Sequence, residues 1–113
     1  MIKEIFAVYD NKTETYGQPY FAITKGEAIR AFQDIINDIT HPLGKHPEDF
    51  ALYALGTYND KNGDLEKLKM PKEVGRGLDF VDKDYQEYLQ IKQSKNNVQQ
   101  MPQMLKEQVQ WNQ

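Results

Sequence analysis

Residues 45–63, KHPEDFALYALGTYNDKNG, form the stretch that decides the fold. Pro47 disfavours helix in the residue before it, so the polar start of this stretch is expected to be a loop. Phe50–Tyr58 is rich in aromatic and apolar residues, which predicts a half-buried or buried strand. A turn cluster follows, and its Asn62-Gly63 pair tolerates the positive φ angles of a hairpin turn. A returning strand is therefore expected near Asp64–Leu68.

A helix is expected upstream of this hairpin. The residues 24–27, TKGE, fit a capping box with Thr24 as the N-cap and Glu27 three residues later. Apolar residues then recur at helical spacing and mark one stripe: Ala28, Phe32, Ile35, Ile36 and Ile39. His41-Pro42 and Gly44 are expected to end the helix.

Two strands are expected before the helix, at Ile2–Tyr9 and Pro19–Ile23. Pro19 can be the first residue of a strand because no ladder hydrogen bond is needed from it there. The predicted order is ββαββ, an α+β fold with a small antiparallel sheet and the helix on one of its faces. The side chains expected to form the core are Phe6, Val8, Phe21, Phe32, Ile35, Ile36, Leu52 and Leu55.

The character of the chain changes after Met70. Pro71 is expected to end the last strand, and the residues from 86 onward are rich in glutamine. We therefore expect an α+β core over 1–70 and, over 71–113, a tail that is partly helical, flexible or ordered by a partner. Weak helical patterns at Tyr85–Leu89 and Met101–Val109 are separated by an expected linker at 94–100.

The composition excludes several classes of protein. With 113 residues the chain has room for one domain and a tail. It contains no cysteine, which excludes disulfides, thiolate catalysis and cysteine-ligated zinc. It has no apolar run of about 18 residues and no basic start followed by an apolar core, so neither a membrane span nor a signal peptide is expected. A cytosolic setting is the natural expectation.

Enzymatic chemistry finds little support. The only serine, Ser94, lies in the expected linker, and Gly75-x-Gly77 lacks the strand and Lys-Ser/Thr pair of a phosphate-binding loop. His41 and His46 lie near acidic residues but without the spacing of a metal site. We expect no catalytic residue, no metal and no cofactor.

Tyrosines are the residues best suited to binding. Tyr9, Tyr16, Tyr20, Tyr53 and Tyr58 come from expected strands and a loop. If several share the face away from the helix, they form a stacking platform for unpaired bases, helped by nearby cations. The alternative is that they cover the open sheet face or a dimer interface, with their hydroxyls in water.

Four segments, in this order, resemble one protein family: GQPYFA at 17–22, AIRAFQD at 28–34, KHPEDFALY at 45–53 and GTYN at 56–59. The chain is similar over roughly residues 2–68 to the small nonstructural DNA-binding protein of gokushoviruses, single-stranded DNA phages of the microvirus group. The resemblance implies a non-enzymatic phage protein in the host cytoplasm. It also implies DNA binding that supports the switch to single-stranded genome synthesis and packaging.

The net charge of −3 opposes this implication, because proteins that bind phosphates are usually basic. Two hypotheses therefore remain. The first is binding of single-stranded DNA without strong sequence preference, by a homodimer or larger assembly that gathers cations into one patch. Its expected DNA-binding residues are Tyr9, Tyr16, Tyr20, Lys25, Arg30, Lys45, His46, Tyr53, Tyr58, Lys72 and Arg76.

The second hypothesis is a protein-interaction or scaffold module that binds no nucleic acid and uses its sheet edge and Gln-rich tail. Phage capsid or replication proteins are possible partners under either hypothesis, and a membrane is not expected to be one.

Overall fold

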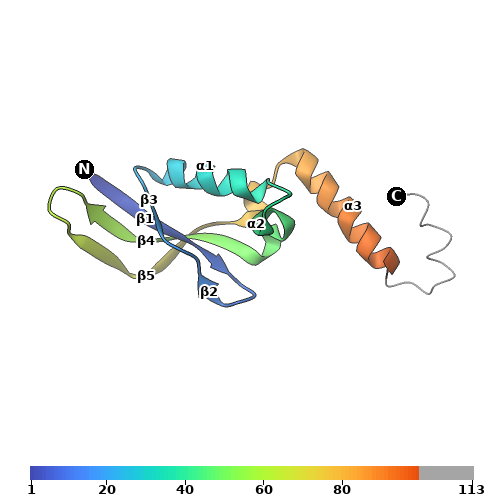
Figure 1. Cartoon of the computed structure of the whole chain (residues 1–113), viewed down its shortest axis with the longest axis horizontal. Helices are drawn as coiled ribbons and strands as arrows, with labels where there is room; N and C mark the ends of the chain where they lie inside the picture. The colour runs from blue at the N-terminus through green and yellow to red at the C-terminus, as the bar shows by residue number, and fades with distance from the viewer. Residues whose placement is uncertain (100–113) are drawn as a thin grey trace. The chain divides into compact units, whose positions relative to one another are not determined.

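An antiparallel sheet of five strands forms the centre of the unit Met1–Val81 (Figure 1). The computed structural model describes residues 1–99. β2 and β3 both pair with one edge of β1, while β4 pairs with its other edge and β5 with β4. The strands are β1 (Ile2–Asp10), β2 (Thr15–Tyr16), β3 (Tyr20–Ala22), β4 (Phe50–Asn59) and β5 (Leu65–Arg76). The predicted α+β class with a small antiparallel sheet is confirmed. The predicted order ββαββ is not, because three strands precede the first helix: β2 (Thr15–Tyr16) lies between β1 and the short β3, which corresponds to the strand expected at Pro19–Ile23.

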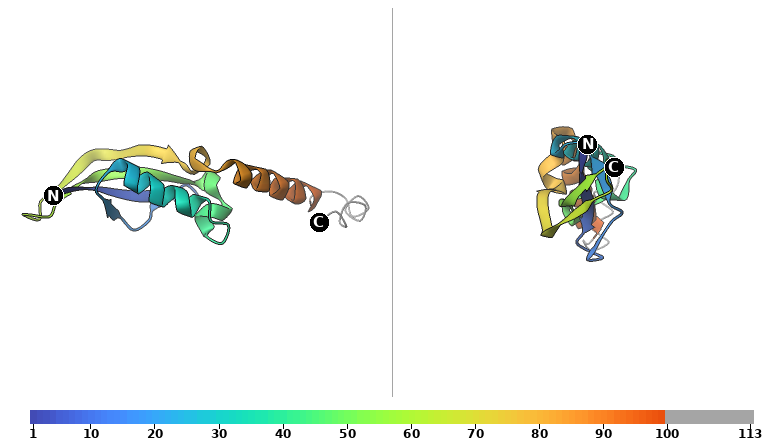
Figure 2. Two further views of the ribbon diagram at one scale, coloured as in Figure 1. Left: turned by 90° about the horizontal axis from the view of Figure 1, so that it is seen from above. Right: turned by 90° about the vertical axis from the view of Figure 1, so that its left-hand side faces the viewer.

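Helix α1 (Lys25–Ile36) lies along one face of the sheet (Figures 1 and 2). Thr24 is its N-cap, as predicted, and the Thr24 hydroxyl accepts a hydrogen bond of 3.1 Å from the backbone N–H of Glu27. The helix ends earlier than expected because Asn37 caps it: the Asn37 side chain donates to the carbonyls of Gln33 and Phe80.

Three short helical turns complete this unit. They are α2 (Pro42–Lys45) and the 3₁₀ turns η1 (Pro47–Asp49) and η2 (Gly77–Phe80). His41 and Pro42, which were expected only to end the long helix, instead start α2: the His41 ring accepts a hydrogen bond from the backbone N–H of Leu43, and Pro42 is the first helical residue.

The core lies between α1 and the sheet. Phe6, Phe32, Ile36 and Leu52 are fully buried, as predicted. Val8 and Leu55 are half-buried. The prediction was wrong for two other residues, since Phe21 is 52% and Ile35 37% exposed. Phe21 alternates with Tyr20 and Ala22, which face the helix, and Ile35 lies on the flank of α1 beside the buried Ile36.

The prediction that Pro71 ends the last strand was wrong, because β5 continues to Arg76. Its pairing with β4 jumps from Lys67 opposite Gly56 to Lys72 opposite Ala54, so the residues between them form a bulge. A bulge in an edge strand accommodates a proline because no ladder hydrogen bond is required from it. The expected boundary at 70/71 therefore falls inside a strand, and the unit continues through η2 to Val81.

The second unit contains α3 (Lys83–Gln99). Figure 2 shows this helix without a break, so the linker expected at 94–100 is wrong for residues 94–99. The helical pattern expected at 101–109 lies outside the described residues. Within residues 1–99, no helix has the length and apolar character needed to cross a membrane.

Candidate nucleic-acid interface

The face of the sheet away from α1, here called the open face, carries aromatic side chains from four strands. Alternate residues of β1 belong to this face, and the register shows which β4 residues share it. The register on this face pairs each β1 residue with one β4 residue: Lys3 with Tyr58, Ile5 with Gly56, Ala7 with Tyr53 and Tyr9 with Ala51. Tyr16 of β2 lies opposite Tyr9, and Phe21 of β3 lies opposite Ile5.

A β-bulge places two of these rings on the same face. Tyr53 and Tyr58 are five residues apart, and in a regular strand they would point to opposite faces. The β1–β4 register shifts by one residue at Leu55, between the pairs Ile5–Gly56 and Phe6–Ala54. This extra residue turns Tyr58 to the side of Tyr53, as bulges commonly redirect side chains.

Tyr9, Tyr16 and Tyr53 form one group of rings, here called the tyrosine cluster. The ring centroids are 4.9 Å apart for Tyr9–Tyr16, 5.9 Å for Tyr9–Tyr53 and 5.6 Å for Tyr16–Tyr53. All three contacts are edge-to-face, which is a favourable arrangement for aromatic pairs. Partial burial raises the pKa of Tyr53, and the Glu73 carboxylate adds to this effect. The Tyr53 hydroxyl therefore stays protonated and able to donate.

Phe21 and Tyr58 form a separate pair on the same face. Their centroids are 5.3 Å apart and the rings are tilted by 47°. Phe21 is 52% exposed. In the register, Tyr58 lies between Lys3 of β1 and Leu65 of β5. This pair is therefore an exposed aromatic surface with a cation on a neighbouring strand.

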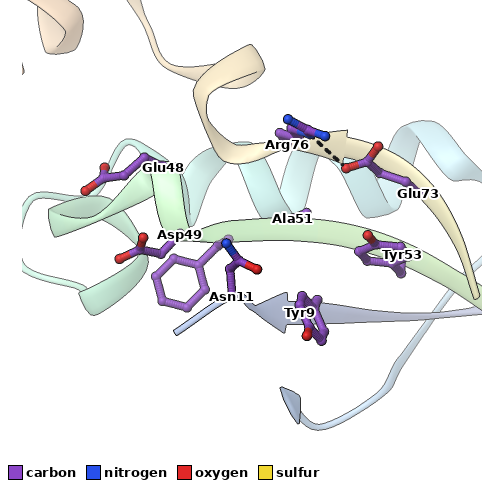
Figure 3. Close-up of a pocket in the computed structure, with 9 residues that line it drawn as sticks. Tyr9, Asn11, Glu48, Asp49, Ala51, Tyr53, Glu73 and Arg76 are labelled. Carbon is purple, nitrogen blue, oxygen red and sulfur yellow. Dashed lines mark hydrogen bonds and ion pairs between the residues drawn. The ribbon is translucent and has the colours of Figure 1, made fainter. Parts of the chain in front are cut away.

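A hollow of about 190 Å³ lies beside the tyrosine cluster (Figure 3). Its wall includes Tyr9 and Tyr53 together with three carboxylates, from Glu48, Asp49 and Glu73. Arg76 is the only cation in this wall, and its Nε lies 3.1 Å from a carboxylate oxygen of Glu73. The hollow is therefore acidic on balance.

The structure brings some of the predicted DNA-binding residues together and leaves others apart. Tyr9, Tyr16, Tyr53, Tyr58 and Arg76 all lie on the open face. Tyr20 lies on the helix side: its hydroxyl donates a 3.1 Å hydrogen bond to the carbonyl of Ala28, and burial raises its pKa.

The predicted cations are mostly elsewhere. Lys25 and Arg30 lie on α1, on the other side of the sheet. Lys45 ends α2, and His46 follows it. Lys72 pairs with Ala54, whose side chain faces the helix side. Only Arg76 among the predicted cations shares a face with the tyrosines.

Sequence reasoning missed Phe21, Lys3 and Lys67 as open-face residues. Phe21 was assigned to the core and its neighbour Tyr20 to the binding face, which is the reverse of the arrangement in β3. The alternation of side chains along a strand is the signal that could have identified Phe21. Once Tyr20 and Ala22 face the helix, Phe21 must face the other way, because a shift of one residue moves every side chain to the opposite face.

A metal site has weak support. His46, Glu48 and Asp49 each place one ligand atom within 4.8 Å of the others. His46 and Glu48 are exposed, and exposed acidic groups of this kind are common in proteins that bind no ion. The absence of a metal stays a prediction.

Comparison with known proteins identifies the family to which this chain belongs. The sequence pattern of the family described as Phage ORF5 protein matches residues 3–80, nearly the whole of the unit Met1–Val81. The chain belongs to this family of phage proteins. Comparisons with curated proteins and with solved structures found no match. The match to the ORF5 family confirms that the protein is a phage protein, and it covers both groups of open-face aromatic residues.

Proposed function

We propose that this ORF5-family protein binds single-stranded DNA, without strong sequence preference, on the open face of its sheet. The observation that supports this proposal is the set of five aromatic rings that four strands place on a face not covered by α1. Unpaired bases stack on such rings, and each stacked base is worth roughly 1–3 kcal/mol. Sheets with exposed aromatic residues are a common platform for single strands.

The helix side is unsuited to duplex recognition. The buried side of α1 is occupied by the sheet. The exposed charges of the helix, two cations (Lys25, Arg30) and two carboxylates (Glu27, Asp34), cancel, so its outer side has no net positive charge to attract phosphates. A recognition helix must instead present side chains that hydrogen-bond base edges in the major groove. Stacking on the open face requires bases that are not paired, so single strands are the favoured ligand.

The proposed biological role rests on the resemblance to gokushovirus proteins. We propose that the protein acts in the host cytoplasm, where it supports the switch to single-stranded genome synthesis and the packaging of that genome. An uncovered aromatic face and few cations per subunit favour a homodimer or larger assembly, which would place several weak contacts along one strand. Phage capsid or replication proteins are proposed as further partners.

A second candidate function is a protein-interaction module without nucleic-acid binding. The edge strand β5 exposes three large apolar side chains, with Leu65 67%, Leu68 39% and Met70 73% exposed. Exposed apolar surface of this kind often marks a protein contact. The net charge of −3 also favours a partner other than DNA.

Fluorescence anisotropy with labelled oligonucleotides distinguishes the two functions. We expect the protein to bind a single strand more tightly than a duplex of the same sequence. The affinity should fall only modestly with salt, with a slope near −0.7 for each phosphate contact. Arg30→Gln on α1 serves as a control and should bind like the parent. No binding to any oligonucleotide at low salt would leave the protein-interaction function as the better explanation.

A further inference from the structure

We propose that, within the DNA-binding function put forward above, the strand is held at the end of the open face formed by Phe21 and Tyr58, and not at the tyrosine cluster. This inference rests on that proposed function and specifies its site. The two ends differ in charge and in the number of contacts that each ring makes with other rings, and both differences favour the same end.

The Phe21–Tyr58 end is flanked by cations. Lys3 lies directly opposite Tyr58 on β1, and Lys67 lies opposite Gly56 on β5, one row further along the same face. The nearby carboxylate of Asp60 is held by the Met1 ammonium at 2.6 Å and lies 4.0 Å from Lys3 Nζ. Two ammonium groups therefore share this carboxylate, and Lys67 adds a further positive charge.

The tyrosine cluster is flanked by carboxylates instead. Glu48, Asp49 and Glu73 line the adjacent hollow, and the single guanidinium there, Arg76, is paired with Glu73 (Figure 3). A phosphate brought to this end meets more negative than positive charge. The resulting repulsion opposes binding most strongly at low salt, where the screening length is longest.

The rings also differ in what they offer to a base. In the tyrosine cluster each ring contacts two others edge-to-face, so the three rings cover parts of one another. Phe21 contacts one ring, Tyr58, and is 52% exposed, compared with 43% for Tyr16 in the cluster. A base can therefore stack on Phe21 without separating an existing aromatic contact.

The geometry indicates how a nucleotide would lie. Lys3 and Lys67 are on β1 and β5, with β4 between them, so the strands that carry them are roughly 9–10 Å apart at the usual strand spacing, and the two residues are offset by one row along those strands. A base stacked on Phe21 or Tyr58 leaves the phosphates on either side of it within reach of these two flexible side chains. The site thus fits a short stretch of single-stranded nucleic acid that crosses the strands.

Matched substitutions at the two ends test this placement by anisotropy with a labelled oligothymidine. Phe21→Leu keeps an apolar side chain but removes the aromatic face, and it should weaken binding roughly 5- to 150-fold, the range for one stacked base at 1–3 kcal/mol. Lys67→Gln should make the salt slope shallower by about 0.7. Tyr16→Leu and Arg76→Gln, at the other end, should weaken binding less than Phe21→Leu does and should change the salt slope by less than Lys67→Gln does.

The outcomes separate this inference from the proposed function. If the parent binds and Tyr16→Leu weakens binding more than Phe21→Leu, the placement is wrong although the protein binds DNA. If the parent binds no oligonucleotide at low salt, the proposed function fails and the placement fails with it. Circular dichroism melting of each variant shows whether a loss of binding comes from unfolding. Phe21→Tyr keeps an aromatic ring at this position and should bind with the affinity of the parent.

Discussion

Replacing Phe32 with alanine should remove a large part of the stability of the unit Met1–Val81. Phe32 is 1% exposed, and its ring meets that of Phe80 edge-to-face at a centroid distance of 5.9 Å. Burying a phenylalanine side chain contributes roughly 1.5–3 kcal/mol, and the cavity that remains after truncation raises the loss to about 3–5 kcal/mol. The edge-to-face contact with Phe80 adds to this loss.

Urea unfolding followed by circular dichroism measures this effect. A domain of this size has a total stability of about 4–12 kcal/mol, so a loss of about 4 kcal/mol is a third of it or more. With a slope of roughly 1 kcal/mol per molar urea, the midpoint should fall by several molar, or the variant should be unfolded without denaturant. Ile35→Ala on the same helix is the control, because Ile35 is 37% exposed and its truncation should cost about 1 kcal/mol or less. A Phe32→Ala protein that unfolds at the midpoint of the parent would show that α1 does not anchor the core.

Three further predictions concern Tyr20, Asp60 and the assembly. Tyr20→Phe removes the hydrogen bond to the Ala28 carbonyl and should cost about 1 kcal/mol in urea unfolding while leaving oligonucleotide affinity unchanged. The hydrogen bond from the Met1 ammonium lowers the pKa of Asp60. The stability that this hydrogen bond contributes is therefore present above the ordinary pKa of an aspartate and is lost as the pH falls through the lowered pKa, which a carbon-detected NMR titration should detect. Asp60→Asn should also tighten single-strand binding, because it frees Lys3. Light scattering at micromolar concentration should give a homodimer or larger, and a mass of 13.2 kDa would contradict this expectation.

Elements defined by local chemistry were predictable from the sequence. The strand at Phe50–Tyr58 is present as β4, and the turn after it contains Gly63 at a φ of +78°, a conformation that glycine adopts without strain. The start of α1 at Thr24 was equally clear, because an N-cap depends on residues within one turn of the chain. In these places neighbouring residues carry all the information.

Elements that depend on distant pairing were not predictable. Pro71 is tolerated inside β5 only because that strand lies at the sheet edge and bulges away from β4. Tyr53 and Tyr58 share a face only because β4 gains one residue at Leu55 relative to β1. Both features are properties of the register between strands, and a single strand's sequence does not fix the register.

The same limit applies to the candidate site. Most of the tyrosines expected to form a platform lie on one face, because large aromatic residues in strands tend to fall on the side that remains partly exposed. The cations were harder to place, since surface lysines satisfy no packing pattern. Lys3 and Lys67 lie beside the rings through strand pairing, whereas Lys25 and Lys45 belong to helices.

The distribution of charge on the open face explains how an acidic chain can be proposed to bind DNA. A net charge of −3 describes the whole molecule, but a phosphate responds mainly to charges within about 10 Å at physiological salt. Two lysines at the Phe21–Tyr58 end give a salt slope of only about −1.4 per subunit, so stacking must supply most of the affinity of each site. A weak site of this kind gains affinity when several copies contact one strand, which connects the expected assembly to the proposed function. A steep salt dependence in the isolated protein would therefore contradict the aromatic site as directly as an absence of binding.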